Sequence, residues 1–304
     1  MERVFTQSKS RTQIKRLWRA RKFGDRTRCP HCDYSRKLWD VDTDQWMCPR
    51  CERKFGLFTQ SWLNRTRFEL PEILELLYWF ELSLTDHDIA EHLDVDYRRV
   101  HRFLMTVREA IRSYEDQTIQ VLDGTVEVDE SYFGAQFQNR RREQRETLRK
   151  EGKVKRGRGA NDLQQAVFGI YERADGIVYV QPVEDVTQDT LQDILRGKVT
   201  VSSTVYSDTW KSYNGLKETF EEHETIEHQA NEYARDDVTI NGIEGFWAFA
   251  EEQFRDHHGV GSDHFECYLK EKEFRWNYRF LNQEAFVRKL LEILAHENEE
   301  ELTS

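Results

Sequence analysis

Apolar side chains recur at helical spacing over residues 68–115, in three stretches separated by short breaks. Pro71 suits the first turn of the first helix, and Thr85 and Asp86 are good N-terminal caps for the second. A tight break at residues 94–96 leads to a longer third helix, so the order predicts a helix-turn-helix-like domain. The third helix would present polar side chains to a DNA groove: Tyr97, Arg98, Arg99, His101 and Arg102. Paired helices with short turns also occur without DNA, and this alternative stays open.

Between residues 122 and 290 the pattern changes to short runs of β-branched and aromatic residues. The expected strands cover residues 125–132, 166–171, 177–182, 204–207 and a segment around 224–228. Asp175-Gly176 joins the second strand to the third, as is typical of a hairpin. Helices are expected over residues 187–195, 243–254 and 266–295. Three antiparallel strands followed by α/β crossovers predict an α/β fold, a mixed sheet with helices on its faces.

Four of the five cysteines form two Cys-Pro-x-Cys pairs, Cys29 with Cys32 and Cys48 with Cys51. The 15 residues between the pairs are within the range of a four-thiolate zinc ribbon. A module of this size buries too little core to fold alone, and zinc would supply the missing free energy. We therefore expect a structural Zn²⁺ within residues 28–58.

The net charge of −11 is divided unevenly along the chain. Residues 1–28 carry a local charge of +8 and residues 138–160 a local charge of +7, whereas the remainder is strongly acidic. Either segment alone is most simply a solvated charge run, but two together favour a polyanionic partner. No apolar run approaches the length of about 20 residues that a membrane span needs, and no signal peptide begins the chain. We expect a soluble, cytoplasmic, nucleoid-associated protein with no membrane partner.

Three acidic residues occupy positions that could bring them together. Asp129 and Asp208 each end a strand-like run, and Glu244 opens an aromatic-rich helix. Carboxylates that converge from two strands and a helix can hold two divalent cations beside a phosphodiester. Each acid also has an ordinary interpretation. Asp129 could lie on the polar face of an edge strand, Asp208 could form a turn, and Glu244 could close a capping box with Asn241.

Five stretches of the chain together resemble one family. They are residues 29–51, 126–134 (Val-Glu-Val-Asp-Glu-Ser-Tyr-Phe-Gly), 206–213, 241–247 and 274–279. The chain resembles bacterial and archaeal insertion-sequence transposases with an N-terminal zinc ribbon and a ribonuclease H-like DDE domain. The resemblance implies an enzyme that binds double-stranded DNA at element ends, as a homo-oligomer. It would cut with Mg²⁺ or Mn²⁺ and join a 3′-hydroxyl to target DNA.

The resemblance also assigns the catalytic residues. Asp129, Asp208 and Glu244 match the three acids, and Asn241 is an alternative for the third because asparagine occurs there in relatives. In the family a Lys or Arg commonly follows two helical turns after the third acid, where this chain has Glu251. We therefore predict that Arg255, about three turns after Glu244, neutralises phosphate and pairs with Glu251.

The domain division expected from these features has five parts. They are a basic arm (1–27), a zinc ribbon (28–58), a helix-turn-helix-like DNA-binding domain (68–115), a ribonuclease H-like catalytic domain (122–290) and an acidic tail (291–304). Trp247, three residues after Glu244, is expected to anchor the catalytic helix, and most histidines near the third acid are expected at the surface. Two other functions stay open: a DNA-binding regulator that uses the large domain only for assembly, and a nuclease of the same fold.

Overall fold

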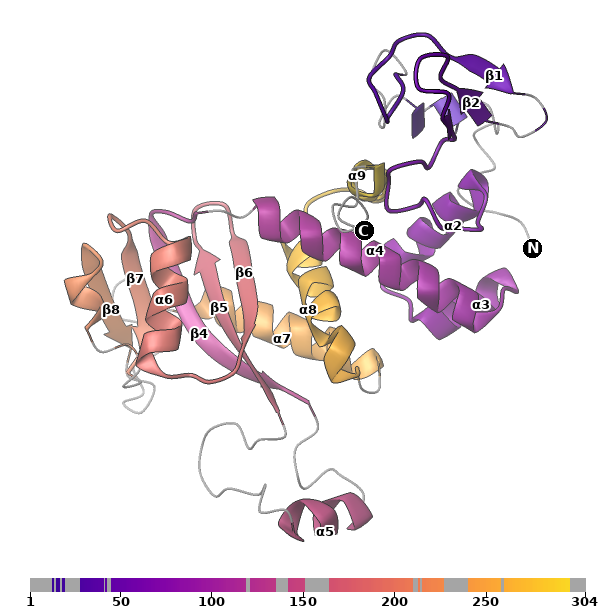
Figure 1. Cartoon of the computed structure of the whole chain (residues 1–304). Coiled ribbons are helices and arrows are strands. Elements are labelled where there is room, and N and C mark those ends of the chain that lie inside the picture. The colour runs from indigo at the N-terminus through magenta and orange to yellow at the C-terminus, as the bar shows by residue number, and fades with distance from the viewer. Residues whose placement is uncertain are drawn as a thin grey trace. The chain divides into compact units, whose positions relative to one another are not determined.

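The computed structural model describes residues 13, 15–16, 18–19, 28–40, 42, 45–118, 121–134, 142–150, 164–209, 213, 215–226, 240–257 and 260–295. Contacts divide the chain into two compact units, residues 1–114 with 280–304 and residues 115–279. Most of the expected basic arm and of the basic segment 138–160 lies outside the described residues, apart from helix α5 (Arg142–Lys150) (Figure 1). No described helix is long and apolar enough to cross a membrane.

The first unit contains a small antiparallel sheet around the four paired cysteines. Its order is β1 (Leu38–Asp40), β2 (Gln45–Met47) and β3 (Lys54–Phe55). Trp46 and Phe55 pack with the cysteines into a core of their own, which is as small as the sequence suggests.

Three helices follow, and their expected order is confirmed: α2 (Leu70–Glu81), α3 (Asp86–Leu93) and α4 (Tyr97–Thr118). Thr85 caps α3 by accepting a hydrogen bond from the Asp88 amide at 3.2 Å. Asp94 takes the left-handed conformation, with φ of 53°, and so ends α3 without a glycine. The buried Asp86 carboxylate then ties α3 to α4 through Arg108 at 2.7 Å.

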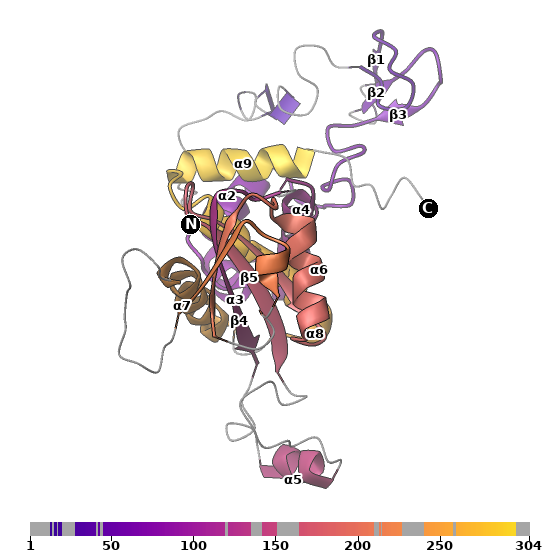
Figure 2. The ribbon, with the colours of Figure 1, turned by 90° about the vertical axis from the view of Figure 1, so that its left-hand side faces the viewer.

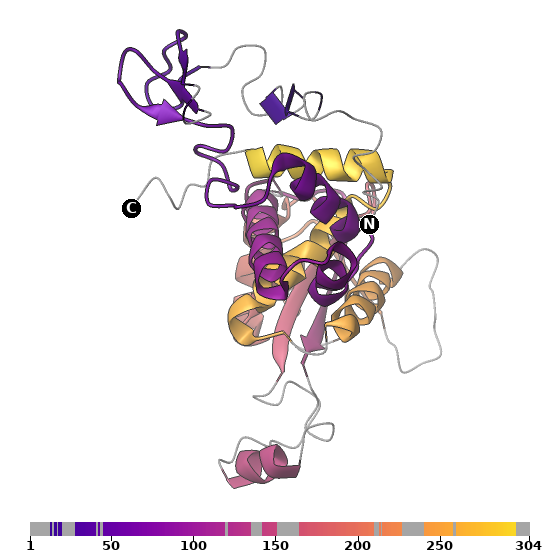
Figure 3. The ribbon, with the colours of Figure 1, turned by 90° about the vertical axis from the view of Figure 1, so that its right-hand side faces the viewer.

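The last helix of the chain packs in the first unit. Helix α9 (Gln283–Ala295) contacts α2, and Gln283 donates a hydrogen bond to Glu81 at 2.8 Å (Figure 3). The single helix expected over residues 266–295 is therefore wrong, because α8 (Ser262–Asn277) ends first and Asn282 accepts from the Ala285 amide at the start of α9. The contacts also end the second unit at residue 279, before the expected boundary at 290.

The second unit is built on a five-stranded sheet of order β6-β5-β4-β7-β8. The strands are β4 (Thr125–Phe133), β5 (Gln165–Glu172), β6 (Ile177–Val183), β7 (Thr204–Asp208) and β8 (Glu222–Ile226). β5 and β6 extend the sheet from β4 in antiparallel fashion, whereas β7 and β8 extend it in parallel. This order and these directions are those of the ribonuclease H-like fold, so the expected mixed sheet is confirmed.

Helices cover both faces and one edge of this sheet. Helix α6 (Gln188–Lys198) packs on one face and α7 (Asn241–Asp256) on the other (Figure 2). Helix α8 runs along the edge strand β6. The Asn277 amide bonds both backbone groups of Val178, and Glu273 accepts from the Val180 amide at 3.1 Å. Pro182 has no N–H to offer, so this edge is closed to a further strand.

Helix α7 approaches the sheet closely because glycines face it. A Cβ atom on Gly169 of β5 would lie 2.5 Å from the Trp247 ring and 2.8 Å from Ile243. A Cβ atom on Gly242 would overlap the Tyr171 ring. Two glycines, one on each partner, thus set the distance between α7 and β5.

We predict that Gly169→Ala destabilises the second unit by about 1–3 kcal/mol, because the new methyl group must displace the Trp247 ring or the strand. Gly197→Ala is the matched control, since a Cβ there meets nothing within 4 Å. That change in α6 should be neutral or stabilise by up to about 1 kcal/mol. Urea unfolding of the full chain measures both, and equal stability of the two variants would contradict the close packing of α7.

Candidate active site

Two carboxylates on one face of β4 hold helix α7 against the sheet. Glu127 accepts a hydrogen bond from the Ile243 amide at 3.0 Å and pairs with Arg173 at 2.7 Å. Asp129, two residues further along the strand, accepts from the Trp247 indole at 3.1 Å. Residues 243 and 247 lie one helical turn apart, so alternate strand positions hold successive turns of α7. The expected anchoring role of Trp247 is confirmed.

The start of α7 rules out the capping-box interpretation of Glu244. Its N-cap residue is Ile240, which makes no side-chain capping bond, and Asn241 is the first helical residue. A capping box would need Asn241 itself as the N-cap residue, so the helix would have to begin one residue later. Glu127 instead supplies the acceptor from the neighbouring strand, which sequence spacing within residues 241–244 could not reveal.

Asp208 and Glu244 come close enough to Asp129 to affect its ionisation. Asp208 ends β7, which runs parallel to β4 with Tyr206 opposite Glu127, so Asp208 and Asp129 extend this register by two residues on the same face. Burial, and then the Asp208 and Glu244 carboxylates, raise the pKa of Asp129 to about 7, although the Trp247 indole opposes the shift. The three residues expected to form the site therefore converge from β4, β7 and α7.

A fourth acid lies beside them on the other face of the sheet. The Tyr213 hydroxyl donates to Glu130 at 2.7 Å, and Tyr213 is fully buried in the core under α6. Burial, and then the charges of Asp129 and Asp208, raise the pKa of Glu130 to about 8. Strand alternation alone could have placed Glu130 on the other face of the sheet from Asp129. Its partner Tyr213 could not be predicted, because it lies more than eighty residues later in the chain.

This arrangement suits a hard divalent cation. Carboxylate oxygens are the ligands that Mg²⁺ and Mn²⁺ prefer, and like charges held together with raised pKa values gain from a cation between them. The carboxylate oxygens of Asp129, Asp208 and Glu244 lie further apart than the ligand atoms around a bound ion would. Among the described residues, only the four paired cysteines bring three or more ligand atoms within 4.8 Å of one another.

Two buried residues, Ser207 and His223, support the backbone of Asp208. Ser207 donates a hydrogen bond to the Asp208 carbonyl at 2.9 Å, and His223 of β8 lies 2.8 Å from the same hydroxyl. The Ser207 hydroxyl thus bridges the Asp208 carbonyl and the His223 ring. The surface position expected for most histidines is wrong for His223, which is 6% exposed. His228 and His258 lie outside the described residues.

The four cysteines form a compact group that fits zinc. Sγ atoms lie 3.6 Å apart in the pairs Cys29–Cys51 and Cys32–Cys48. Tetrahedral zinc with bonds of about 2.3 Å separates its sulfur ligands by about 3.8 Å. Each knuckle closes in the same way: the left-handed residues Asp33 and Glu52 donate to the carbonyls of Cys29 and Cys48. The donor set and geometry both suit a structural Zn²⁺.

The arginines expected to bind DNA differ in their surroundings. Arg98 and Arg102 are exposed on α4. The Arg99 guanidinium instead lies 4.0 Å over the Phe68 ring and donates to the Arg67 carbonyl, so it holds the start of α4 in place. His101 is likewise paired, with Asp86 at 2.6 Å.

Arg255 is exposed on α7, but the pairing predicted for it is not found. Glu251 accepts a hydrogen bond from Ser131 of β4 at 3.4 Å. Both Arg255 and Glu251 are described, and no ion pair joins them. The helical spacing of the two residues is correct, yet the sheet beneath α7 offers Glu251 a nearer partner.

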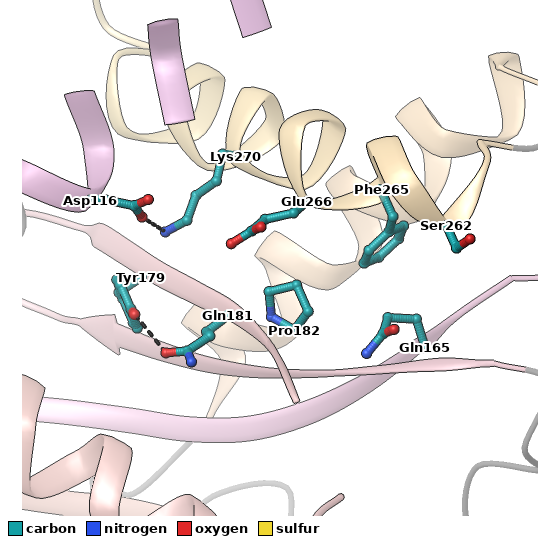
Figure 4. A pocket seen from close by; sticks show the side chains of 9 residues that line it. All are labelled: Asp116, Gln165, Tyr179, Gln181, Pro182, Ser262, Phe265, Glu266 and Lys270. Carbon is teal, nitrogen blue, oxygen red and sulfur yellow. Dashed lines mark hydrogen bonds and ion pairs between the residues drawn. The ribbon is translucent and has the colours of Figure 1, made fainter. Parts of the chain in front are cut away.

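A hollow of about 440 Å³ lies elsewhere in the second unit, between β6 and α8 (Figure 4). The buried Lys270 ammonium faces it and pairs with Asp116 at 3.4 Å and Glu273 at 2.9 Å. None of the three converging acids lines this hollow. The Lys270 charge is thus paired within the fold.

Known proteins are similar to this chain over the second unit and, in one case, beyond it. The sequence model of the ISXO2-like transposase domain matches residues 121–277. A protein of the transposable element ISH50 of Halobacterium salinarum is 28% identical over 235 residues, 76% of this chain and 78% of that protein. A transposase-like protein of Haemophilus influenzae is 37% identical over 114 residues, 38% of this chain and 92% of that protein. The BIV integrase catalytic core is 11% identical over 49% of this chain and 80% of that structure, with a TM-score of 0.30.

The pKa of Asp129 predicts a specific pH dependence of stability. Its pKa of about 7 in the folded chain exceeds its ordinary value of 3.8, so the folded state holds this proton more tightly than the unfolded state. With no Mg²⁺ or Mn²⁺ added, stability should therefore fall as pH rises from about 4 to about 7. Asp129→Asn should weaken this fall, with Glu130 retaining part of it. Urea unfolding with zinc retained measures the slope; Asp193→Asn, an exposed control on α6, should keep it. Equal slopes in all three proteins would contradict the burial of Asp129.

The His223–Ser207 pair predicts a difference between two substitutions. His223→Leu removes the polar partner of a buried hydroxyl and should destabilise the chain by about 1–3 kcal/mol. His223→Gln can present an amide N–H in place of Nε2 and should lose less. Thermal unfolding compares them, and a Leu variant as stable as the Gln variant would show that the hydrogen bond does not matter.

Proposed function

The chain belongs to the ISXO2-like transposase family, and we propose that it is a DDE transposase that cleaves DNA at the ends of an insertion sequence and joins the freed strand to target DNA. The observation that carries this proposal is the approach of Asp208 and Glu244 to Asp129, close enough to raise its pKa. Carboxylates in this number and order are suited to phosphodiester transfer through bound divalent cations.

In this proposal Asp129, Asp208 and Glu244 hold Mg²⁺ or Mn²⁺. Bound divalent cations neutralise charge on the phosphodiester and activate the attacking oxygen, water in cleavage and a 3′-hydroxyl in joining. The protein's part is to orient the acids. Trp247 fixes one oxygen of Asp129, Glu127 fixes the helix that carries Glu244, and Ser207 with His223 fixes the backbone of Asp208.

The remaining roles concern DNA. Arg98 and Arg102 lie exposed one turn apart on α4, where they can enter a groove of double-stranded element-end DNA. Arg255 contacts a phosphate from α7, without Glu251 as its partner. The zinc ribbon stabilises the N-terminal module, and the chain acts as a homo-oligomer on DNA, since two element ends must be joined to one target.

We predict that Asp129→Asn and Asp208→Asn each lower cleavage and joining on the order of a thousandfold, because cation binding worth several kcal/mol to the transition state is lost. Binding to element-end duplexes should persist. The substrate is a plasmid carrying the element ends with their flanking DNA, incubated with Mg²⁺ or Mn²⁺, and Asp193→Asn is the control.

Each other outcome names a different function. Cleavage without joined product would indicate a nuclease of the same fold. End binding without cleavage by the parent chain, in either cation, would indicate a DNA-binding regulator. Full activity of Asp129→Asn would sink the assignment of the three acids.

A further inference from the structure

The zinc ribbon exposes one indole ring while it buries another. Trp39 of β1 lies opposite Trp46 of β2, and the two rings meet edge-on with centroids 5.2 Å apart. Trp46 is 5% exposed, whereas Trp39 is 47% exposed. The buried ring thus supports the exposed one, which stands on the surface with little freedom to collapse.

Two cations lie over the Trp46 ring of this pair. The Arg19 guanidinium lies 4.7 Å from the centroid of Trp46, and the Lys37 ammonium lies 6.0 Å from it. Arg19 is held there by its neighbour Trp18, which is buried and donates to the Leu57 carbonyl at 2.9 Å. Burial, and then the Arg19 charge, lower the pKa of Lys37. The fold therefore holds two positive charges close together although they repel each other.

The opposite side of β1 differs in charge. Asp40, the neighbour of Trp39 in sequence, points to the other side and pairs with Lys54 at 2.6 Å. The acid of this strand is therefore neutralised away from the exposed ring. We use the term Trp39 face for Trp39, Lys37 and Arg19 around Trp46.

We propose that the Trp39 face binds a single-stranded segment of DNA, with Trp39 stacked on an unpaired base and with Arg19 and Lys37 against the neighbouring phosphates. Exposed aromatic rings beside cations are the chemistry by which proteins bind single strands. A base within a duplex shows only its edges, whereas an unpaired base offers the flat surface that an indole matches. The two cations favour a polyanion over an apolar protein partner. The proposal rests on the proposed transposase function, in which cleavage leaves single strands at the element ends.

Binding of the full-length, zinc-loaded chain to oligothymidine and to a blunt duplex, followed by fluorescence anisotropy, tests the proposal. Trp39→Ala should weaken oligothymidine binding about tenfold or more, whereas Trp39→Phe should keep most of the affinity. Lys37→Ala should lower the slope of log affinity against log salt by about 0.7, and Trp39→Ala should leave that slope unchanged. Leu38→Ala is the matched control, because Leu38 is 54% exposed on the other side of the same strand. Zinc content confirms that each variant folds.

Each of the following results would overturn the proposal and leave the transposase function standing. The first is oligothymidine binding by Trp39→Ala that is as tight as that of the parent chain. The second is a loss of affinity in Trp39→Ala that is equally large for the blunt duplex. The third is a change in the oligomeric state of Trp39→Ala in the absence of DNA, which would make the Trp39 face a protein contact. A parent chain that binds the duplex but not the single strand would do the same. A parent that binds neither DNA would overturn both the inference and the proposed function.

Discussion

The attachment of helix α7 to strand β4 is the contact on which the candidate site depends. A carboxylate of β4 caps the start of the helix, and a second carboxylate two residues later holds the next turn through Trp247. Because the rise of one helical turn is close to the rise of two strand residues, one rigid element fits the other without distortion. The third acid, Glu244, lies on α7 between the two contact residues Ile243 and Trp247. Its backbone position relative to Asp129 is therefore fixed by these two contacts.

This attachment places a cost on the metal-free protein. Two acids that hold α7, together with Asp208 and Glu130, bring negative charge into a partly buried region, and the pKa values of Asp129 and Glu130 rise to about 7 and about 8. Positive charge bound beside these acids would lower the cost of ionising them. Any cation that binds the folded chain and not the unfolded one therefore adds stability as well as chemistry. The fold tolerates these neighbouring acids because Arg173 neutralises Glu127. The close packing of Trp247 and Ile243 over Gly169 also leaves α7 no room to shift on the sheet.

Much of this could be predicted from the sequence, since the relevant signals are local. Strand alternation, the Asp175-Gly176 turn and the paired cysteines indicate the central strands, the hairpin and the ribbon, and all three are present. Contacts between distant segments could not be predicted in this way. Nothing near Glu127 shows that it caps a helix more than a hundred residues later, and nothing near His223 shows that it is buried beside Ser207. The break between α8 and α9 was missed because the helical pattern continues across it.

The two candidate metal sites of the chain illustrate why one was easier to predict than the other. The cysteines approach one another within short knuckles, whose geometry is set by the residues between and just after each pair. Their spacing alone therefore carries most of the structural information. The acids come from two strands and a helix, and their approach depends on the register of β4 with β7 and on the depth at which α7 packs. Sequence can propose which carboxylates belong together only through the flanking residues of each. The compactness of the sites differs in the same sense: the thiolates already lie within reach of one ion, whereas the carboxylates repel one another and gain most from the cation they would hold.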